Sequence, residues 1–127
     1  MDLAQIRISE TRDHQVIVLR ERNGSRLLQI LIGLSEALAI DRRVKEMRLQ
    51  RPMTHDLLAN VIEALSCELE KVVINDLQEG TFYAKLVLRH HGRLVEVDSR
   101  PSDAIALVAG TDVPLYVEDH VLAEAAS

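Results

Sequence analysis

One stretch decides how this chain folds: Val95-Glu-Val-Asp-Ser-Arg-Pro-Ser-Asp-Ala-Ile-Ala-Leu107. Residues 94–97 have the character of a strand, whereas residues 104–109 are apolar nearly all round, which predicts a short buried helix. The polar residues 98–103 lie between them, at a strand-to-helix junction. Such junctions expose unpaired backbone N–H groups that attract anions, so a binding or catalytic site and a well-capped helix both fit these residues.

The segments around this stretch predict strands joined by short turns. In the C-terminal half the strand-like segments are residues 68–76, 81–89, 93–98 and 114–118. Turn signals lie between them at Glu79-Gly80 and at His90-His91-Gly92. Residues 119–126 predict a short terminal helix.

The N-terminal third predicts a β-hairpin or meander followed by a helix. Its strand-like segments are residues 3–9, 15–20 and 26–32. Asn23-Gly24 is typical of a two-residue hairpin turn. From Ser35, which suits an N-cap, apolar residues recur at helical spacing as far as Met47.

A second helix is predicted after the break at Arg51-Pro52, because proline bars helix continuation and pushes the preceding residue toward extended geometry. Thr54 is its predicted N-cap. Its predicted buried stripe consists of Leu57, Leu58, Val61, Ile62 and Leu65. The chain shows no linker, repeat or low-complexity stretch.

Length and composition indicate one domain over residues 1–127. The hydrophobic fraction of 47% is enough for one core, and with only three aromatic residues that core must be aliphatic. The lone Cys67 excludes an intramolecular disulfide and a cysteine-built zinc site. The N-terminus carries no secretory signal pattern and no apolar run approaches ~18 residues, so we expect a cytoplasmic protein that does not enter a membrane.

Charge is distributed unevenly along the chain. The net charge of −5 argues against tight nonspecific duplex binding, yet residues 1–51 carry a balance of +3 and residues 52–127 a balance of −8. The basic residues of one segment are Arg42, Arg43, Lys45, Arg48 and Arg51. They fit a solvated helix face or a patch that contacts phosphates, and both interpretations stay open.

Familiar catalytic fingerprints are missing, among them the Gly-rich phosphate loop and the His-Glu-x-x-His motif. What remains is a possible carboxylate site, since Asp98 ends a strand and Asp103 lies in the first turn of the next helix. Two or three converging carboxylates suit Mg²⁺ or Mn²⁺, which activate water for attack on a phosphodiester. Arg100 would then hold the phosphate, or would simply pair with one of these acids in a helix cap.

The first turn of the second predicted helix holds His55 and Asp56. Asp56 suits the helix dipole as a capping charge. His55 has no such structural reason, and because an imidazole titrates near neutral pH it is a candidate general acid or base. Arg51-Pro-Met-Thr-His-Asp56 also echoes Arg100-Pro-Ser-Asp103, so two helix starts of this kind are candidates to face one pocket.

Three ordered motifs resemble the bifunctional nuclease domain family: Arg51-Pro-Met-Thr-His-Asp-Leu57, Gly80-Thr-Phe-Tyr-Ala84 and Asp98-Ser-Arg-Pro-Ser-Asp-Ala-Ile-Ala-Leu107. Further likeness comes from Ile32-Gly33 with Glu36-Ala37, and from Pro114-Leu-Tyr-Val117. The resemblance covers nearly the whole chain. It implies a small α+β domain with a mixed β-sheet of about six to seven strands and three to four helices. It also implies a homo-oligomer, a dimer or higher, and nuclease activity on DNA and RNA.

The first hypothesis from these residues is a metal-assisted nuclease. Its expected ligands for Mg²⁺ or Mn²⁺ are Asp98, Asp103 and Glu36. The expected catalytic residues are His55, Asp98 and Asp103. The residues expected to bind the nucleic-acid substrate are Arg51, Arg100, Ser102, Arg42 and Arg43.

Two other hypotheses stay open. The protein is alternatively a non-catalytic oligomeric binding or assembly module, in which the Arg-Pro motifs are structural helix caps. A third reading is an effector site for a small anion or nucleotide at the two helix starts. Leu28-Gln-Ile-Leu31 departs from the proline and aromatic residue that tend to stand there in the family, which bears on substrate binding.

Overall fold

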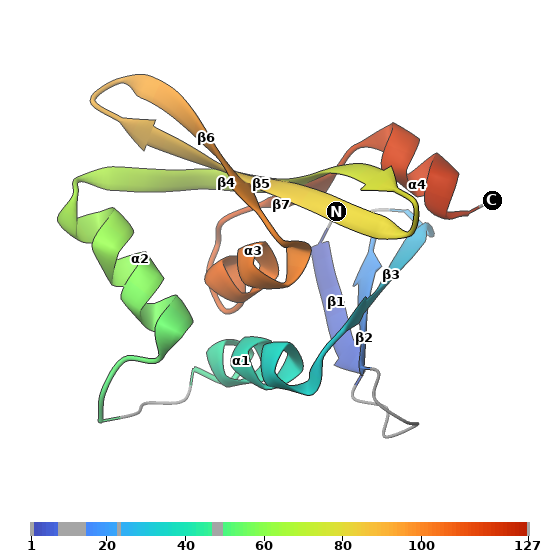
Figure 1. Ribbon diagram of the computed structural model, residues 1–127, viewed down its shortest axis with the longest axis horizontal. Helices are drawn as coiled ribbons and strands as arrows, with labels where there is room; N and C mark the ends of the chain where they lie inside the picture. Colours follow the sequence, from blue (N-terminus) through green and yellow to red (C-terminus); the bar gives the residue numbers. More distant parts are fainter. Residues whose placement is uncertain (1, 8–14, 23, 47–49, 127) are drawn as a thin grey trace.

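The structure, a computed structural model, describes residues 2–7, 15–22, 24–46 and 50–126. In these ranges the strands are β1 (Asp2–Arg7), β2 (Gln15–Arg20), β3 (Leu27–Ile32), β4 (Cys67–Gln78), β5 (Thr81–His90), β6 (Arg93–Ser99) and β7 (Leu115–Val117). The helices described are α1 (Leu34–Val44), α2 (Thr54–Ala64), α3 (Pro101–Val108) and α4 (Asp119–Ala125). Every predicted segment has its counterpart (Figure 1), and the α+β class is confirmed.

The strands divide between two sheets rather than forming a single one. β1, β2 and β3 make an antiparallel three-stranded sheet, and the second sheet has the order β6-β5-β4-β7. Only the second sheet is mixed, because β7 runs parallel to β4 while the other pairs are antiparallel. In Figure 1, α1 and α3 lie on one side of the four-stranded sheet, with α2 toward one end and the three-stranded sheet toward the other.

The hydrophobic core lies between the four-stranded sheet and the helices beneath it. Alternate residues of a strand share a face, so Val72 and Ile74 of β4 point inward together with Ala84 and Leu86 of β5. All of α3 except Asp103 is buried, as the apolar run at residues 104–109 predicts. The same buried cluster includes residues of β2 and β3, so one core joins the two sheets.

Two tight turns shape the four-stranded sheet. Glu79 and Gly80 have φ values of 50° and 80°, and His91 and Gly92 have 50° and 78°. Positive φ at both central residues is the pattern of the type I′ turn, whose twist matches that of the strands it joins. The two turns predicted from the sequence are therefore confirmed as two-residue hairpin loops.

The β2–β3 connection is longer than the two-residue turn expected at Asn23-Gly24. It is closed where the backbone N–H of Glu21 donates to the carbonyl of Arg26 at 2.9 Å, and their side chains form an ion pair. The pairing of β2 with β3 therefore ends at Glu21 and Arg26 and does not extend to Asn23-Gly24. Asn23 itself lies outside the described residues, as do residues 8 and 9 of the first predicted strand.

Two predicted N-caps are each displaced by one or two residues. α1 begins after Gly33 rather than Ser35, and α2 after Met53 rather than Thr54. At α2 the cap is made from inside the helix, because the backbone N–H of Met53 donates to Oδ2 of Asp56 at 3.1 Å. The expected capping role of Asp56 is thus confirmed.

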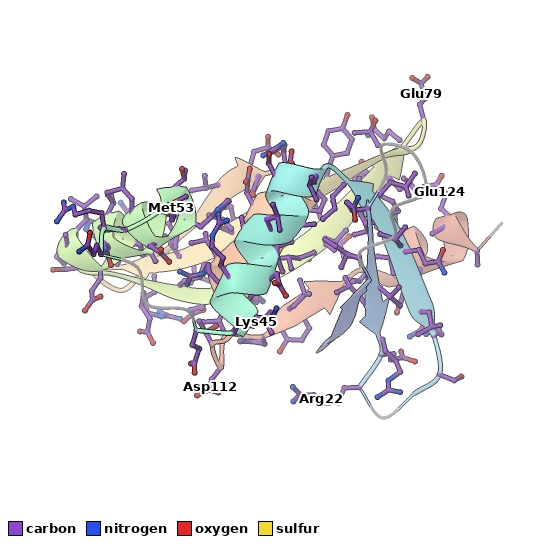
Figure 2. The ribbon with its side chains drawn as sticks, turned by 90° about the horizontal axis from the view of Figure 1, so that it is seen from below. Arg22, Lys45, Met53, Glu79, Asp112 and Glu124 are labelled. Atoms are coloured by element: carbon purple, nitrogen blue, oxygen red, sulfur yellow. The ribbon has the colours of Figure 1, made fainter. Side chains whose placement is uncertain are left out.

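The predicted burial of the α2 stripe is wrong for most of its residues. Ala59 and Ile62 are partly buried against the core, whereas Leu57, Val61 and Leu65 remain 56%, 43% and 62% exposed. The helix packs mainly against β4 and α3. Figure 2, seen from below, shows α2 starting at Met53, clear of the three-stranded sheet. No helix within the described ranges is long and apolar enough to span a membrane.

Candidate functional site

The start of α3 projects a polar cluster at the point where β6 ends. Arg100 is the N-cap residue in extended conformation, and Pro101 occupies the first helical position, where its missing N–H costs nothing. Asp103 lies in the first turn with its side chain 32% exposed. Ser102 turns the other way and is only 6% exposed.

His55 from the first turn of α2 meets Asp103, although the two residues are 48 positions apart. Nε2 of His55 lies 2.8 Å from Oδ1 of Asp103, and the imidazole is 17% exposed. Burial acts to raise the pKa of Asp103, but hydrogen bonds from Arg100 and His55 outweigh it and hold that pKa below its usual value. An ionised carboxylate only accepts, so the network assigns the proton to Nε2 and leaves Nδ1 as the basic nitrogen.

Arg100 extends this pair to a third helix. Its Nε donates to Oδ2 of Asp103 at 2.9 Å and its Nη2 to Oδ1 at 3.2 Å, a two-pronged contact with one carboxylate. Its Nη1 lies 3.4 Å from Oε1 of Glu36, in the first turn of α1. We call Glu36, Arg100, Asp103 and His55 the four-residue network; it joins the starts of α1, α3 and α2.

Arg43 forms a separate bracket between helices. Its Nη1 donates to Oδ1 of Asp56 at 2.6 Å, and its Nη2 donates to the carbonyl of Leu107 at 3.1 Å. The hydrogen bond from the backbone N–H of Met53 is the main cause that keeps the pKa of Asp56 below its usual value, and the hydrogen bond from Arg43 lowers that pKa further. Two guanidinium nitrogens of Arg43 therefore bind protein atoms and tie α1 to α2 and α3, while its expected contact with phosphate stays a prediction.

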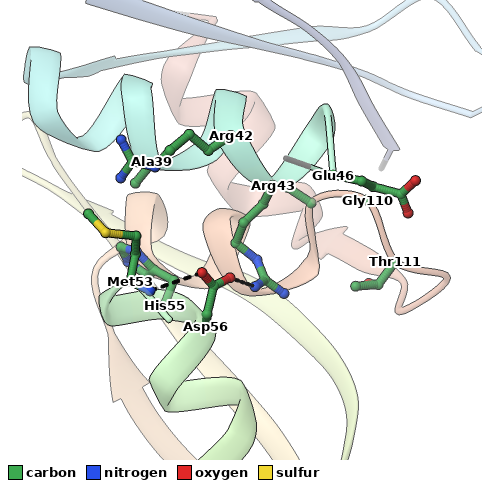
Figure 3. Close-up of a pocket in the computed structure, with 10 residues that line it drawn as sticks. Ala39, Arg42, Arg43, Glu46, Met53, His55, Asp56, Gly110 and Thr111 are labelled. Atoms are coloured by element: carbon green, nitrogen blue, oxygen red, sulfur yellow. Dashed lines mark hydrogen bonds and ion pairs between the residues drawn. The ribbon is translucent and has the colours of Figure 1, made fainter. Parts of the chain in front are cut away.

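A small cavity, the α1–α2 pocket, opens beside His55 (Figure 3). It has a volume of about 210 Å³ and is lined by Ala39, Arg42, Arg43, Glu46, Met53, His55, Asp56, Ala109, Gly110 and Thr111. In Figure 3 Arg42 and Met53 face one side of the pocket, while Arg43 and Asp56 meet near its centre. Arg42 and His55 line the same pocket, so Arg42 supplies a cation near the His55–Asp103 pair, which we call the dyad.

A larger cavity, the inter-sheet groove, lies on the opposite side of the network. Its volume is about 520 Å³, and it is lined by Gln29, Ile30, Leu31, Ile32, Gly33, Glu36, Gly80, Thr81, Phe82, Arg100, Pro101 and Ser102. It is thus bounded by β3, the β4–β5 hairpin and the starts of α1 and α3. Within the four-residue network, His55 lines the α1–α2 pocket, whereas Glu36 and Arg100 line the inter-sheet groove.

Asp98 does not join this network. It stands opposite Lys85 in the β5–β6 ladder, while its neighbour Ser99 stands opposite the buried Ala84. Since successive residues of a strand point to opposite faces, Asp98 lies on the outer face of the sheet and α3 beneath the inner one. Arg51 is exposed just before α2, and Arg48 lies outside the described residues.

The expected metal ligands are therefore only partly brought together. Glu36 and Asp103 both pair with Arg100, whereas Asp98 faces away. No group of three or more His, Cys, Asp or Glu side chains suited to a metal ion is found in the part of the chain that the structure describes.

Sequence reasoning placed His55, Asp103 and Arg100 together but missed two features. The bracket from Arg43 to Asp56 gave no local signal, because the partners lie on different helices 13 residues apart. The inter-sheet groove was also missed. Its walls include Phe82 and Gly33, which belong to the motifs that resemble the family but had been given no role.

Comparison with known proteins gives a consistent result. The chain is 47% identical over 120 residues to an uncharacterized protein from Mycobacterium tuberculosis, covering 94% of this chain and 71% of the relative. It is 24% identical to Bifunctional nuclease 1 from Oryza sativa subsp. indica and 28% identical to Bifunctional nuclease 2 from Oryza sativa subsp. japonica, covering 36% and 35% of those longer proteins. The model of the bifunctional nuclease domain matches residues 17–127. The chain therefore belongs to the bifunctional nuclease domain family.

Proposed function

We propose that this protein hydrolyses phosphodiester bonds in DNA and RNA, with His55 as general base and Asp103 as the residue that orients it. The 2.8 Å contact from His55 Nε2 to Asp103 Oδ1 carries the proposal, because a carboxylate-held imidazole moves protons well near neutral pH. The substrate class is supported by the family and by relatives named as bifunctional nucleases.

In the reaction, a water oxygen attacks phosphorus while Nδ1 of His55 accepts one proton of that water. The bond from phosphorus to the leaving nucleotide oxygen breaks, and that oxygen takes up a proton from solvent. Arg42 in the α1–α2 pocket and the exposed guanidinium of Arg100 flank the dyad, and both offset negative charge on the phosphate oxygens. Asp103 holds the imidazole through Nε2 and favours the imidazolium that forms.

Assistance by Mg²⁺ or Mn²⁺ stays a prediction, and no step of the reaction is assigned to a metal. Both ions prefer oxygen ligands arranged around one point. Of the three expected carboxylates, Glu36 and Asp103 both pair with Arg100, and Asp98 lies on the other face of the sheet. This donor set, in the observed arrangement, does not fit such an ion.

The test compares cleavage of single-stranded RNA and DNA by the parent protein and by His55→Gln, Asp103→Asn and Asp98→Asn. We expect His55→Gln to lower the rate by about 10²–10⁴-fold, the usual contribution of a general base. Asp103→Asn should lower it by at least about tenfold, while Asp98→Asn serves as the matched control and cuts like the parent. Each reaction is run with Mg²⁺, with Mn²⁺ and with EDTA.

Equal cutting by all four proteins would mean that the activity does not come from this site. The network would then be a bracket between helices, as the assembly hypothesis holds. Thermal melts of the same variants show whether a loss of cleavage comes from the changed side chain or from unfolding of the protein. If only Asp98→Asn abolishes cleavage, and EDTA abolishes that of the parent, the metal-based hypothesis replaces the dyad.

We further propose that the protein forms a homo-oligomer through α2. Leu57, Val61 and Leu65 lie on one stripe of that helix, four residues apart, and are largely exposed. The chain exposes 8375 Å², whereas a compact monomer of 14.3 kDa exposes about 6,800 Å². A standard interface buries about 800 Å² on each partner, less than this excess, so a second copy of this chain is the occupant that best fits the stripe.

A further inference from the structure

The inter-sheet groove touches the four-residue network and is larger than the α1–α2 pocket. The proposed hydrolysis does not use it. Its walls bring together segments far apart in the sequence: the end of β3, the start of β5 and the start of α3. Ile32, Phe82 and Pro101 provide apolar surface, and Phe82 is one of only three aromatic residues in the chain. Such walls suit the faces of a flat ring.

Polar groups stand at the end of the groove nearest the network. Ser102 is only 6% exposed and lines the groove, so its hydroxyl is placed to donate a hydrogen bond to a ligand or to accept one. Arg100 and Glu36 lie at the same end, so both a cation and a carboxylate are available beside the apolar walls.

The Glu36 carboxylate lies close to the backbone of Gly33. A Cβ added at Gly33 would stand 2.7 Å from Oε2 of Glu36, so the glycine leaves room for the carboxylate in this position. Oε1 faces Arg100 at 3.4 Å, a long contact that a ligand donor can replace. The carboxylate thus offers two acceptor oxygens on the groove wall.

Two adjacent acceptors select for two adjacent donors. On the Watson–Crick edge of guanine, N1–H and the N2 amino group stand side by side, whereas adenine, cytosine and uracil each present donors next to acceptors. The Ser102 hydroxyl both donates and accepts, so it suits a further polar atom of the ring. The chemistry of the groove therefore favours guanine over the other bases.

We propose that the inter-sheet groove binds the guanine base of the nucleotide next to the scissile phosphate, with Glu36 as the residue that reads it. This inference rests on the proposed function, because it places the base on one side of Arg100 and the phosphate at the His55–Asp103 pair on the other. Arg100 contacts both Glu36 and Asp103, so it links base recognition to the phosphate position.

The first experiment measures binding without catalysis. Guanosine, adenosine, cytidine and uridine 5′-monophosphates and inorganic phosphate are titrated separately into the full chain in a calorimeter. We expect guanosine monophosphate to bind at least about tenfold more tightly than the other three nucleotides, which corresponds to about 1.4 kcal/mol. Equal affinities for all four nucleotides and for phosphate would overturn the proposal.

Variants then assign the preference to the groove. Glu36→Gln keeps the size of the side chain but turns one acceptor into a donor, so it should remove the guanine preference and leave phosphate binding unchanged. Ser102→Ala should weaken guanosine monophosphate binding by a few-fold. Glu96→Gln, on the outer face of the sheet, is the matched control and should keep the preference. A guanine preference that survives Glu36→Gln would contradict the assignment.

Cleavage mapping separates failure of this inference from failure of the proposed function. On a mixed-sequence RNA, cuts should cluster next to guanine in the parent, and Glu36→Gln should spread them evenly. Cleavage that depends on His55 but shows no base preference leaves the hydrolase in place and rejects the base site. Selective guanosine monophosphate binding without any cleavage keeps the base site and rejects the hydrolase.

Discussion

At the scale of single residues, function and stability meet at Asp103. Its carboxylate accepts hydrogen bonds from Arg100 and His55, and it is the only residue in the network bonded to two others by contacts of 3.2 Å or less, as far as the structure is described. These bonds favour its ionised form and lower its pKa, against the effect of burial. The same contacts that orient His55 therefore also make folding depend on pH.

The pH dependence has a definite sign. Because the folded-state pKa of Asp103 lies below the usual value for an aspartate, its ionised form contributes stability that is fully present above that usual value. The contribution is lost as the pH falls through the lowered pKa. We expect the difference in unfolding free energy between the parent and Asp103→Asn to be constant above about pH 5 and to shrink below it. Urea titrations from pH 7 to pH 3 measure this difference; one that stays constant to pH 3 would refute it.

Gly110 is a second position where one residue decides local packing. Its φ is +76°, and an added Cβ would stand 2.4 Å from the carbonyl oxygen of Arg43 at the end of α1. We expect Gly110→Ala to cost roughly 2–4 kcal/mol, from backbone strain together with the clash. Gly92→Ala is the matched control, since φ is +78° there but nothing lies within 4 Å of the added atom. Equal losses for the two variants in denaturant titrations would show that the close approach does not matter.

At the scale of elements, helix starts and hairpin turns organise the molecule. The starts of α1, α2 and α3 contribute Glu36, His55 and the Arg100–Asp103 pair, so the candidate site depends on how three helices are held. The bracket from Arg43 to Asp56 and to the carbonyl of Leu107 provides that restraint. Between β4 and β5 the type I′ turn fixes the strand register, and with it the position of Phe82.

The β4–β5 turn contains a residue, Glu79, whose substitution should stabilise the fold. Glu79 sits at φ 50°, a conformation that Asn adopts more readily, at the hairpin tip seen in Figure 2. We expect Glu79→Asn to stabilise the fold by about 0.5 kcal/mol. Glu79→Ala provides the comparison, because it removes the charge without gaining the preference. Thermal melts in which both variants fall below the parent would argue against this account of the turn.

At the scale of the whole molecule, α2 leaves an apolar stripe exposed on the chain. The helix has no fully buried residue, although its sequence carries a full apolar stripe. The area exposed by the chain is larger than its mass requires, and the stripe accounts for part of that excess. A partner surface on a second copy satisfies both observations.

Light scattering coupled to size exclusion tests this assembly. We expect the parent to elute as a dimer or larger species and Val61→Lys to shift toward the monomer, because a charge in an apolar interface is costly. Asn60→Lys, on an exposed position next to the stripe, is the matched control and should leave the oligomer intact. A parent that is monomeric at all concentrations would remove the basis for the second copy.

The sequence by itself determined the secondary structure and the family. Period-2 and helical patterns, Gly80 and Gly92 at the hairpins, and Pro101 at the start of α3 act over a few residues, so they are legible in the chain. Only the tertiary structure decided which polar residues meet. The pairing of His55 with Asp103 spans 48 positions. Asp98 is separated from this pair because the helices cover the opposite face of its sheet. Those outcomes depend on long-range packing, which local patterns do not encode.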